Sequence, residues 1–486
     1  MSYAVDQLEP KTVWKYFDEI RKIPHGSGNE RALGEAVMSW AREHDCETEM
    51  DDLGNVVIRV PATKGHEKTP TVVLQGHLDM VCEKNSDKDF DFEKDAIELA
   101  RDGDWITADG TTLGADNGIG VAMSLAMMDT PDAVHGPLEL LFTVDEETGL
   151  NGATGLKPGF VSGDKLVNLD SEDLGVFYVG CAGGRDAHIS LPLEREAAAE
   201  GAECLTLRLR GLRGGHSGLD IVDNRGNAIE LLARAVDAAL REANLRLVSI
   251  EGGDKHNAIP REASAAIQVG AGETDKIKSI VEARLAGLRE EFGAVAPELD
   301  LAVEKSDLPA EVLTAETTRR AIGILLALPS GVLTMSRDIV GLVETSNNMA
   351  RVRCEGDKME VLTSGRSAVD AAIDGVIARI RAVGELAGAE VEPEEGYPGW
   401  QPNMGSELLA TSKQVWIDVH GEEPKFTAIH AGLETGIIGE KNPGMDMVSI
   451  GPQIDNPHSP DERVSIDSVK KTFDFVVGLL DRLARD

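Results

Sequence analysis

The sequence predicts an α/β protein with a mixed, largely parallel sheet flanked by helices and with a second, inserted α+β domain. Apolar runs of strand length alternate with helical patterns in the first part of the chain, an order typical of parallel sheets. At 486 residues the chain is too long for one hydrophobic core, so we expect two domains. Acids and histidines that suit one shared site lie on both sides of the middle segment. The two ends of the chain are therefore expected to form one domain around the insertion.

The N-terminal elements are a helix followed by strands. Apolar residues at Val13, Phe17 and Ile20 have helical spacing. Thr12 is expected to cap this helix. Strands are expected at residues 56–60, 71–74, 138–144, 165–169 and 176–179, and a second helix is expected from Asn117 to Met128. Ligands bind beyond the carboxyl ends of the strands in such sheets, so polar residues that follow these runs are candidates for a site.

Residues 188–396 predict the inserted α+β domain. Strands are expected at 205–209 and 263–269, paired strands at 349–353 and 359–362 around EGDK, and helices at 229–240 and 369–380. After the acidic stretch VEPEEGYPGW the chain resumes with a helix and then a strand at 447–450. Residues 1–187 and 397–486 are thus expected to form the other domain.

Composition argues against several classes of partner. The chain has 48 Lys and Arg against 85 Asp and Glu, and this net charge of −37 repels nucleic acid and anionic membranes. The N-terminus lacks the basic and apolar regions of a secretory signal, and no apolar run is long enough to span a bilayer. The five cysteines are odd in number and lack CxxC spacing, as expected for reduced thiols in a cytoplasmic protein.

The candidate functional residues are acids and histidines spread over most of the chain. They are His77 and Asp79 in GHLDM, Asp116 in GADNG, Glu146 and Glu147 in DEETG, Asp170 in NLDSE, and His458 in NPHSPDER. Two histidines with several carboxylates form a ligand set that suits zinc or a similar divalent metal. The set has more acids than one tetrahedral site uses, which indicates two metals and a general base.

Each motif by itself has a plainer interpretation. His77 and Asp79 face the same way on an extended chain, where they also suit a polar pair at a strand end. Asp-Asn-Gly around Asp116 is a common turn. Adjacent glutamates at 146 and 147 are most simply a solvated acidic loop, and Asp170 and His458 suit a cap and a surface residue. The joint occurrence of these motifs is what favours a metal site.

The motifs resemble those of a known family. GHLDMV, LGADNGIG, FTVDEETGLNGA, NLDSE, CAGG and HSPDER look like the M20 metallopeptidases, in particular their bacterial aminoacyl-histidine dipeptidase branch. The resemblance covers essentially the whole chain, with no departure at any metal or catalytic position. It implies a zinc-peptidase-like catalytic domain with an inserted lid domain through which the chain forms a homodimer.

The resemblance implies a role for each candidate, with two Zn²⁺ per chain that Mn²⁺ or Co²⁺ can replace. His77 and Asp170 would bind one zinc, Glu147 and His458 the other, and Asp116 would bridge them; Asp79 would orient His77, and Glu146 would be the general base. In the middle domain, His216 of GGHSG would assist the scissile carbonyl, and Asn257, Arg366 and Gly432 would hold the substrate. The Asp116–Asn117 peptide bond is expected to be cis.

Three functions are compatible with these motifs. The first is hydrolysis of dipeptides, notably Xaa-His types such as carnosine. The second is deacylation of N-acyl amino acids by an amidohydrolase of the same clan, which would use the same metal site. The third is a peptide-binding protein that kept the fold and lost its chemistry. Such a protein should lack a metal ligand or the base, and none is missing from this sequence.

Overall fold

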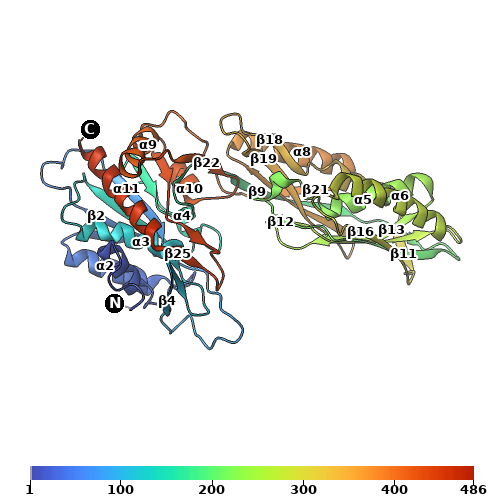
Figure 1. Ribbon diagram of the computed structural model, residues 1–486. Coiled ribbons are helices and arrows are strands. Elements are labelled where there is room, and N and C mark those ends of the chain that lie inside the picture. Colours follow the sequence, from blue (N-terminus) through green and yellow to red (C-terminus); the bar gives the residue numbers. More distant parts are fainter. Residues whose placement is uncertain (1–2, 486) are drawn as a thin grey trace. The chain divides into compact units, whose positions relative to one another are not determined.

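The computed structural model describes residues 3–485 and divides into two compact units (Figure 1). Unit 1 comprises Met1–Cys181, Trp400–Ala428 and Leu433–Asp486, and unit 2 comprises Ala182–Gly399 and Ile429–Gly432. The chain thus leaves unit 1 after residue 181 and re-enters it at residue 400, whereas the sequence predicted these boundaries at 187 and 397. The short segment 429–432 also belongs to unit 2, which the sequence did not indicate.

Unit 1 is built on an eight-stranded mixed sheet in the order β1-β2-β6-β3-β7-β23-β8-β22. Its strands are β1 (Glu47–Met50), β2 (Val56–Val60), β3 (Val72–His77), β6 (Leu138–Thr143), β7 (Lys165–Asn168), β8 (Val176–Cys181), β22 (Lys425–Ile429) and β23 (Asp446–Ser449). The four central strands β6, β3, β7 and β23 run parallel. Every residue of β3 and β6 is buried, as parallel strands with both faces covered require.

The C-terminal part of the chain completes this sheet. Residues Asp446–Ser449 of β23 pair in parallel with Lys165–Asn168 of β7, so segments from both sides of unit 2 lie side by side in one sheet. A separate four-stranded sheet, in the order β24-β25-β5-β4, consists of β24 (Ile454–Asp455), β25 (Arg463–Ser465), β5 (Trp105–Ala108) and β4 (Leu99–Asp102). The loop between β24 and β25 contains His458.

Helices flank the sheet of unit 1. They are α1 (Lys11–Ile20), α2 (Arg31–Glu43), α3 (Ala115–Ala126), α4 (Asn151–Gly155), α9 (Glu407–His420), α10 (Glu434–Lys441) and α11 (Ile466–Arg485). The first helix begins one residue before Thr12, and its N-cap is Pro10, with no capping side chain. The expected Thr12 cap is therefore wrong, because a proline ahead of Lys11 lets the helix start earlier. Among the described residues, no helix is long and apolar enough to cross a bilayer.

Unit 2 contains an antiparallel sheet in the order β16-β11-β15-β13-β19-β20-β9-β21, with β18 paired to β19. Its strands are β9 (Gly183–Pro192), β11 (Glu203–Arg210), β13 (Arg246–Gly253), β15 (Ala263–Val269), β16 (Asp300–Ser306), β18 (Gly331–Met335), β19 (Val343–Glu355), β20 (Lys358–Ser367) and β21 (Glu390–Pro393). Strands β19 and β20 form the predicted hairpin, with Glu355 opposite Lys358.

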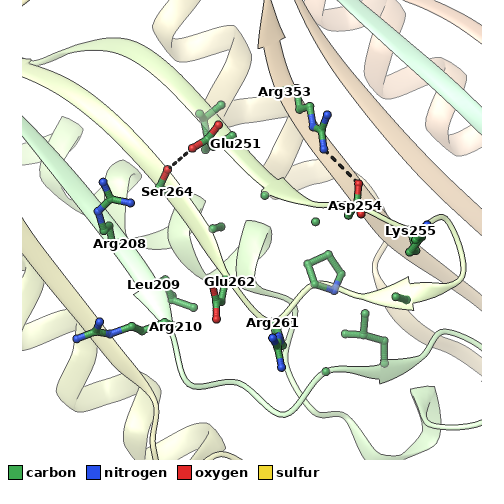
Figure 2. Close-up of a pocket in the computed structure, with 18 of the residues that line it drawn as sticks. Arg208, Leu209, Arg210, Glu251, Asp254, Lys255, Arg261, Glu262, Ser264 and Arg353 are labelled. Carbon is green, nitrogen blue, oxygen red and sulfur yellow. Dashed lines mark hydrogen bonds and ion pairs between the residues drawn. The ribbon is translucent and has the colours of Figure 1, made fainter. Parts of the chain in front are cut away.

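Four helices pack against the sheet of unit 2: α5 (Ala228–Glu242), α6 (Thr274–Phe292), α7 (Ala315–Ala327) and α8 (Asp370–Ala387). A groove of about 1000 Å³ runs beside β11, β13 and β15 (Figure 2). Its side chains carry both charges: Arg353 lies 3.2 Å from Asp254, and Ser264 donates a hydrogen bond to Glu251. Two short ribbons complete the unit, namely β10 (Arg195–Ala197) with β17 (Glu311–Leu313), and β12 (Gly215–His216) with β14 (Ala258–Ile259).

Candidate metal centre

Polar side chains gather where three neighbouring parallel strands of unit 1 end. His77 is the last residue of β3, Asp170 lies two residues beyond β7, and Glu146 and Glu147 lie in the loop after β6. Because β6, β3 and β7 run parallel, their carboxyl ends meet at one edge of the sheet. This arrangement confirms that these residues follow the strand ends.

The first donor set consists of His77, Asp116 and Asp170. Nε2 of His77 lies 3.2 Å from Oδ1 of Asp116 and 3.2 Å from Oδ1 of Asp170. One ligand atom from each residue lies within 4.8 Å of the other two. The His77 side chain is buried, and the two carboxylates are nearly so.

The second donor set consists of Asp116, Glu147 and His458. Nε2 of His458 lies 3.1 Å from Oδ2 of Asp116 and 3.0 Å from Oε1 of Glu147. Asp116 therefore directs one carboxylate oxygen to each histidine, which is the geometry of a bridging ligand between two cations. The His458 ring is about half exposed, so this side of the centre is open to solvent.

The start of helix α3 determines where Asp116 points. The Asp116–Asn117 peptide bond is cis, as predicted, and Asp116 has φ −85° and ψ 107°, outside the helical region. Nδ2 of Asn117 donates to the Leu169 carbonyl at 2.6 Å, one residue before Asp170. A Cβ at Gly120 would lie 2.3 Å from the same carbonyl oxygen. Gly120, the last glycine of GADNGIG, thus lets α3 approach the segment that leads from β7 to Asp170.

The electrostatics of the two sets favour a cation between them. Asp116 and Glu147 raise the pKa of His458 to about 11. Burial opposes protonation of His77, yet Asp170 and Asp116 raise the pKa of His77 well above its usual value. Oε1 of Glu147 and Oδ1 of Asp170 are buried and accept no hydrogen bond of good geometry, although imidazole nitrogens lie close by. A divalent cation would satisfy these oxygens and remove the need for protonated histidines, so the donor sets fit zinc or a similar metal.

Asp79 connects the first donor set to the loop after β6. Its Oδ1 lies 3.4 Å from Nδ1 of His77, and the backbone N–H groups of Glu146 and Glu147 donate to its two oxygens at 3.0 and 3.1 Å. Ser27 adds a further hydrogen bond at 2.8 Å. Burial alone would raise the pKa of Asp79, but His77 and these N–H donors lower it to about 2. Asp79 therefore stays ionised, and its backbone carbonyl oxygen lies nearer to Nδ1 of His77, at 3.0 Å, than its carboxylate does.

Glu146 lies beside the two donor sets, and one of its carboxylate oxygens is within 4.8 Å of ligand atoms of His77 and Glu147. Burial raises its pKa well above the usual value, and the negative charges of Asp170, Glu434 and Glu147 add to that rise. Glu434 is fully buried, and its Oε2 accepts hydrogen bonds from Gln75 at 2.6 Å and Thr143 at 2.7 Å. A carboxylate with a raised pKa beside metal ligands is suited to accept and release protons.

Unit 2 contains the predicted substrate-binding residues. His216 lies in strand β12, and its Nδ1 accepts hydrogen bonds from the N–H groups of Gly218 at 3.2 Å and Leu219 at 3.1 Å. Burial and the charge of Arg366 lower its pKa. The neutral ring therefore carries its proton on Nε2, where it is free to donate. The Asn257 carbonyl accepts the N–H of Ser217, which holds Asn257 beside the His216 ribbon.

Arg366 is buried in strand β20 and lacks a full set of acceptors. Its Nη1 donates to Oη of Tyr397 at 2.9 Å, while its Nε has no hydrogen-bond partner. His430 is also buried, and its Nε2 lies 2.7 Å from Oγ of Ser346. Burial and the charge of Arg366 lower the pKa of His430 to about 3. Gly432 lies two residues further along, in the segment 429–432.

Several residues at these sites were not predicted from the sequence. They are Glu434, Glu462, Tyr397 and His430, together with Glu172, whose pKa is raised to about 8 by burial and by Asp116 and Asp170. Burial also raises the pKa of Glu462 to about 7, against four N–H donors that favour its ionised form. His430 and Glu434 lie in HAGLETG, and Glu462 lies in HSPDER. From these two motifs only Gly432 and His458 were predicted as site residues. The sequence alone does not show that these side chains are buried.

Comparisons with known proteins agree with this architecture. The profile of Peptidase family M20/M25/M40 matches residues 73–482. The chain is 43% identical to the cytosol non-specific dipeptidase of Escherichia coli (strain K12) over 476 residues, which covers 98% of each chain. It is also similar to the crystal structure of aminoacylhistidine dipeptidase from Vibrio alginolyticus, with 43% identity, a TM-score of 0.93 and 98% coverage of both chains.

A more distant solved structure shares the fold. A tripeptidase from Staphylococcus aureus is 16% identical, with a TM-score of 0.58 over 99% of this chain and 100% of that one. The overall fold is therefore retained at low sequence identity.

Proposed function

The chain belongs to the peptidase family M20/M25/M40, and from this premise we propose that it is a metal-dependent dipeptidase acting on Xaa-His and similar dipeptides, carnosine among them. The observation that carries the proposal is Asp116, whose two oxygens face the ring nitrogens of His77 and His458. The relatives at 43% identity over nearly their full length are dipeptidases by name.

Two cations would occupy the two donor sets, and we propose zinc, with manganese or cobalt as substitutes. His77 and Asp170 would hold one cation, Glu147 and His458 the other, and Asp116 both. Bound divalent cations lower the pKa of water from ~16 toward ~7 and polarise the carbonyl that is attacked.

Glu146 is proposed as the general base. It takes the proton of the attacking water and passes it to the amine that leaves when the peptide bond breaks. Burial and the neighbouring carboxylates raise the pKa of Glu146, which makes it a better proton acceptor than an exposed glutamate. Asp79 supports this role indirectly, because its carboxylate accepts the backbone N–H of Glu146.

His216 is proposed to stabilise the negative charge that develops on the carbonyl oxygen. Its Nδ1 is occupied by two backbone donors, so the neutral ring presents the N–H at Nε2. A donor held in this way needs no reorganisation when the charge forms. We propose that unit 2 acts as a lid whose closure over unit 1 delivers this donor.

Arg366 is proposed to bind the C-terminal carboxylate of the substrate. Its Nε lacks an acceptor and Tyr397 fixes the adjacent Nη1, so the guanidinium is positioned to form further hydrogen bonds. A carboxylate clamp one residue beyond the scissile bond would select dipeptides. Asn257 and Gly432 complete the proposed substrate site.

Three further properties are proposed. We infer a homodimer formed through unit 2 and a cytoplasmic location, the latter in agreement with the name of the Escherichia coli relative. The net charge of −37 argues against nucleic acid and anionic membranes as partners.

The alternative function is deacylation of N-acyl amino acids. These substrates share the C-terminal carboxylate that Arg366 would bind, so the two functions differ only on the N-terminal side of the scissile bond. Hydrolysis rates should be measured for carnosine, Leu-His and acetyl-histidine with zinc-loaded protein. We expect cleavage of the dipeptides at rates at least tenfold above that of acetyl-histidine. Preferential cleavage of acetyl-histidine would replace the dipeptidase with the deacylase.

A further inference from the structure

Glu462 contacts the backbone of Asp116 and lies four residues after His458 in the sequence. Both of these residues are proposed as metal ligands. The Glu462 carboxylate accepts the backbone N–H groups of Leu113 at 2.7 Å, Gly114 at 3.0 Å, Ala115 at 2.7 Å and Asp116 at 3.3 Å. The side chain is 2% exposed, and no cationic side chain within residues 3–485 forms an ion pair with it. The hydrogen bonds described for this carboxylate therefore all come from one backbone turn, residues 113–116.

This turn is the start of helix α3, which carries Asp116. Asp116 and Asn117 have non-helical backbone angles, so the N–H groups of Leu113 to Asp116 lie before the regular helix and need acceptors from elsewhere. The local sequence LGAD offers no capping side chain, and the residue at the cap position is Gly114. Glu462, from a segment more than 300 residues away in the sequence, supplies the acceptors for these N–H groups.

The same residue is linked to the other side of the centre. Glu462 lies four residues after His458 in HSPDER, and its own N–H donates to the Ser459 carbonyl at 3.0 Å. Its carbonyl oxygen accepts a hydrogen bond from Thr107 at 2.9 Å, which fixes the end of the His458 loop to strand β5. One residue thus joins the loop that carries His458 to the turn that carries Asp116.

We propose that Glu462 is a positioning residue of the metal centre, which sets the separation of Asp116 and His458. The inference rests on the proposed function, because it concerns ligands of the same centre. Metal–ligand distances tolerate deviations of only ~0.2 Å, so a small shift of the Asp116 turn weakens binding. Partners that orient ligands without touching the metal typically contribute 10- to 100-fold to metal affinity.

Replacement by glutamine tests this role because the shape is retained. An amide has one acceptor oxygen, so Glu462→Gln keeps two of the four N–H contacts and turns its own NH₂ donor toward the other two. The turn is then pushed away from the His458 loop, whereas the hydrophobic core is unchanged.

Glu139 offers a matched control in the same unit. It is 3% exposed and accepts the backbone N–H groups of Ser162 at 2.7 Å and Gly163 at 3.0 Å. It differs in three ways: both N–H groups donate to Oε2, Oγ of Ser162 donates to Oε1 at 2.9 Å, and Arg59 lies 3.7 Å away. Ser162 and Gly163 precede strand β7, at the end of the sheet opposite the metal ligands. Glu139→Gln therefore removes the charge of a buried carboxylate that accepts backbone N–H groups, without touching the centre and without turning an amide donor toward those N–H groups.

The experiment is a titration of zinc into metal-free wild type, Glu462→Gln and Glu139→Gln with a competing chelator, together with metal-free melting curves and the visible absorption of cobalt-loaded protein. We expect both variants to melt below wild type. Only Glu462→Gln should lose 10- to 100-fold in affinity for at least one metal and show a changed cobalt spectrum. Equal zinc affinities in Glu462→Gln and wild type, or equal losses in both variants, would overturn the inference.

Two further outcomes are distinguishable. If wild type binds no zinc, the proposed function fails, and the inference fails with it. If Glu462→Gln does not fold, Glu462→Asp replaces it, since a carboxylate one methylene shorter keeps the charge but reaches less far. Glu462→Asp should then lose at least tenfold in zinc affinity, and wild-type affinity in Glu462→Asp would overturn the inference.

Discussion

Nε2 of His458 lies 3.1 Å from Oδ2 of Asp116, although 342 residues separate the two in the sequence. Asp116 comes from the part of the chain before unit 2, and His458 comes from the part after it. The pairing of β23 with β7 brings the C-terminal segment back into the sheet, and the loop after β24 then carries His458 to the centre. The candidate metal centre therefore forms only when the segments before and after unit 2 fold together into unit 1.

Alanine substitutions at the two adjacent glutamates of DEETG are expected to have different effects on activity and metal content. Glu146→Ala should lower the catalytic constant by about 10²- to 10⁴-fold, the usual contribution of a general base, while the metal content stays at the wild-type value. Glu147→Ala should lower the metal content, because Glu147 is proposed as a ligand. Metal analysis by mass spectrometry and steady-state kinetics on both variants test the assignment. Normal activity in either variant, or the same metal content in both, would refute it.

Arg366→Lys should lower dipeptide hydrolysis without changing metal content. Lysine keeps the charge and loses the two-pronged hydrogen bond, and such charged hydrogen bonds contribute ~1.5–3 kcal/mol. We expect kcat/KM for dipeptides to fall by about 10- to 100-fold on this basis. Steady-state kinetics on carnosine and Leu-His measure the change. Wild-type kcat/KM on both substrates would show that Arg366 does not bind the carboxylate.

His216→Ala should affect the catalytic constant more than the Michaelis constant, because the oxyanion exists only in the transition state. Removal of one such donor typically costs ~10²- to 10³-fold in kcat. The same kinetic measurements decide the matter. If KM rises and kcat is unchanged, His216 binds the ground state of the substrate, and the proposed lid mechanism is wrong in that respect.

His430 should make the free energy of unfolding depend on pH. Burial, with the charge of Arg366, lowers its pKa to about 3 in the folded protein, against ~6.5 when unfolded. Below pH ~6.5 the unfolded chain binds a proton that the folded protein does not bind, so stability falls as the pH falls. The loss is ~1.4 kcal/mol per pH unit, or ~2 kcal/mol at pH 5.

The measurement for this prediction is thermal unfolding of metal-free wild type and His430→Gln between pH 5 and pH 8. Metal-free protein is used for both, so that titration of the metal ligands is the same in each. The melting temperature of wild type should fall more steeply toward pH 5 than that of His430→Gln. Parallel curves would mean that the pKa of His430 is the same in the folded and the unfolded protein.

Much of the fold was predictable because periodic patterns report burial directly. Residues 56–60 and 263–269 were expected as strands and are strands with the same bounds. The parallel order of the first unit followed from alternating strands and helices, and the family resemblance that the motifs indicated is confirmed by the profile match over residues 73–482. The predicted cap of the first helix was wrong: the helix begins at Lys11, and the residue at its N-cap is Pro10 rather than Thr12.

The supporting residues of the site were not predictable in the same way. Glu434 matters because Gln75 and Thr143, from strands far away in the sequence, donate hydrogen bonds to it in a fully buried position. Glu462 matters because it accepts four N–H groups from another segment. Each is one glutamate among 85 acidic residues, and only the tertiary structure distinguishes it from a solvated one.

The most direct test of the account is dipeptide hydrolysis by metal-stripped protein before and after zinc is added back. We expect the stripped wild-type protein to be inactive, activity on Leu-His to return as zinc is added, and that activity to reach its full value near two equivalents per chain. Asp116→Ala should recover almost no activity under the same titration, because it removes the carboxylate that faces both histidines. Full activity in the stripped protein, or full recovery in Asp116→Ala, would contradict the metal centre described above.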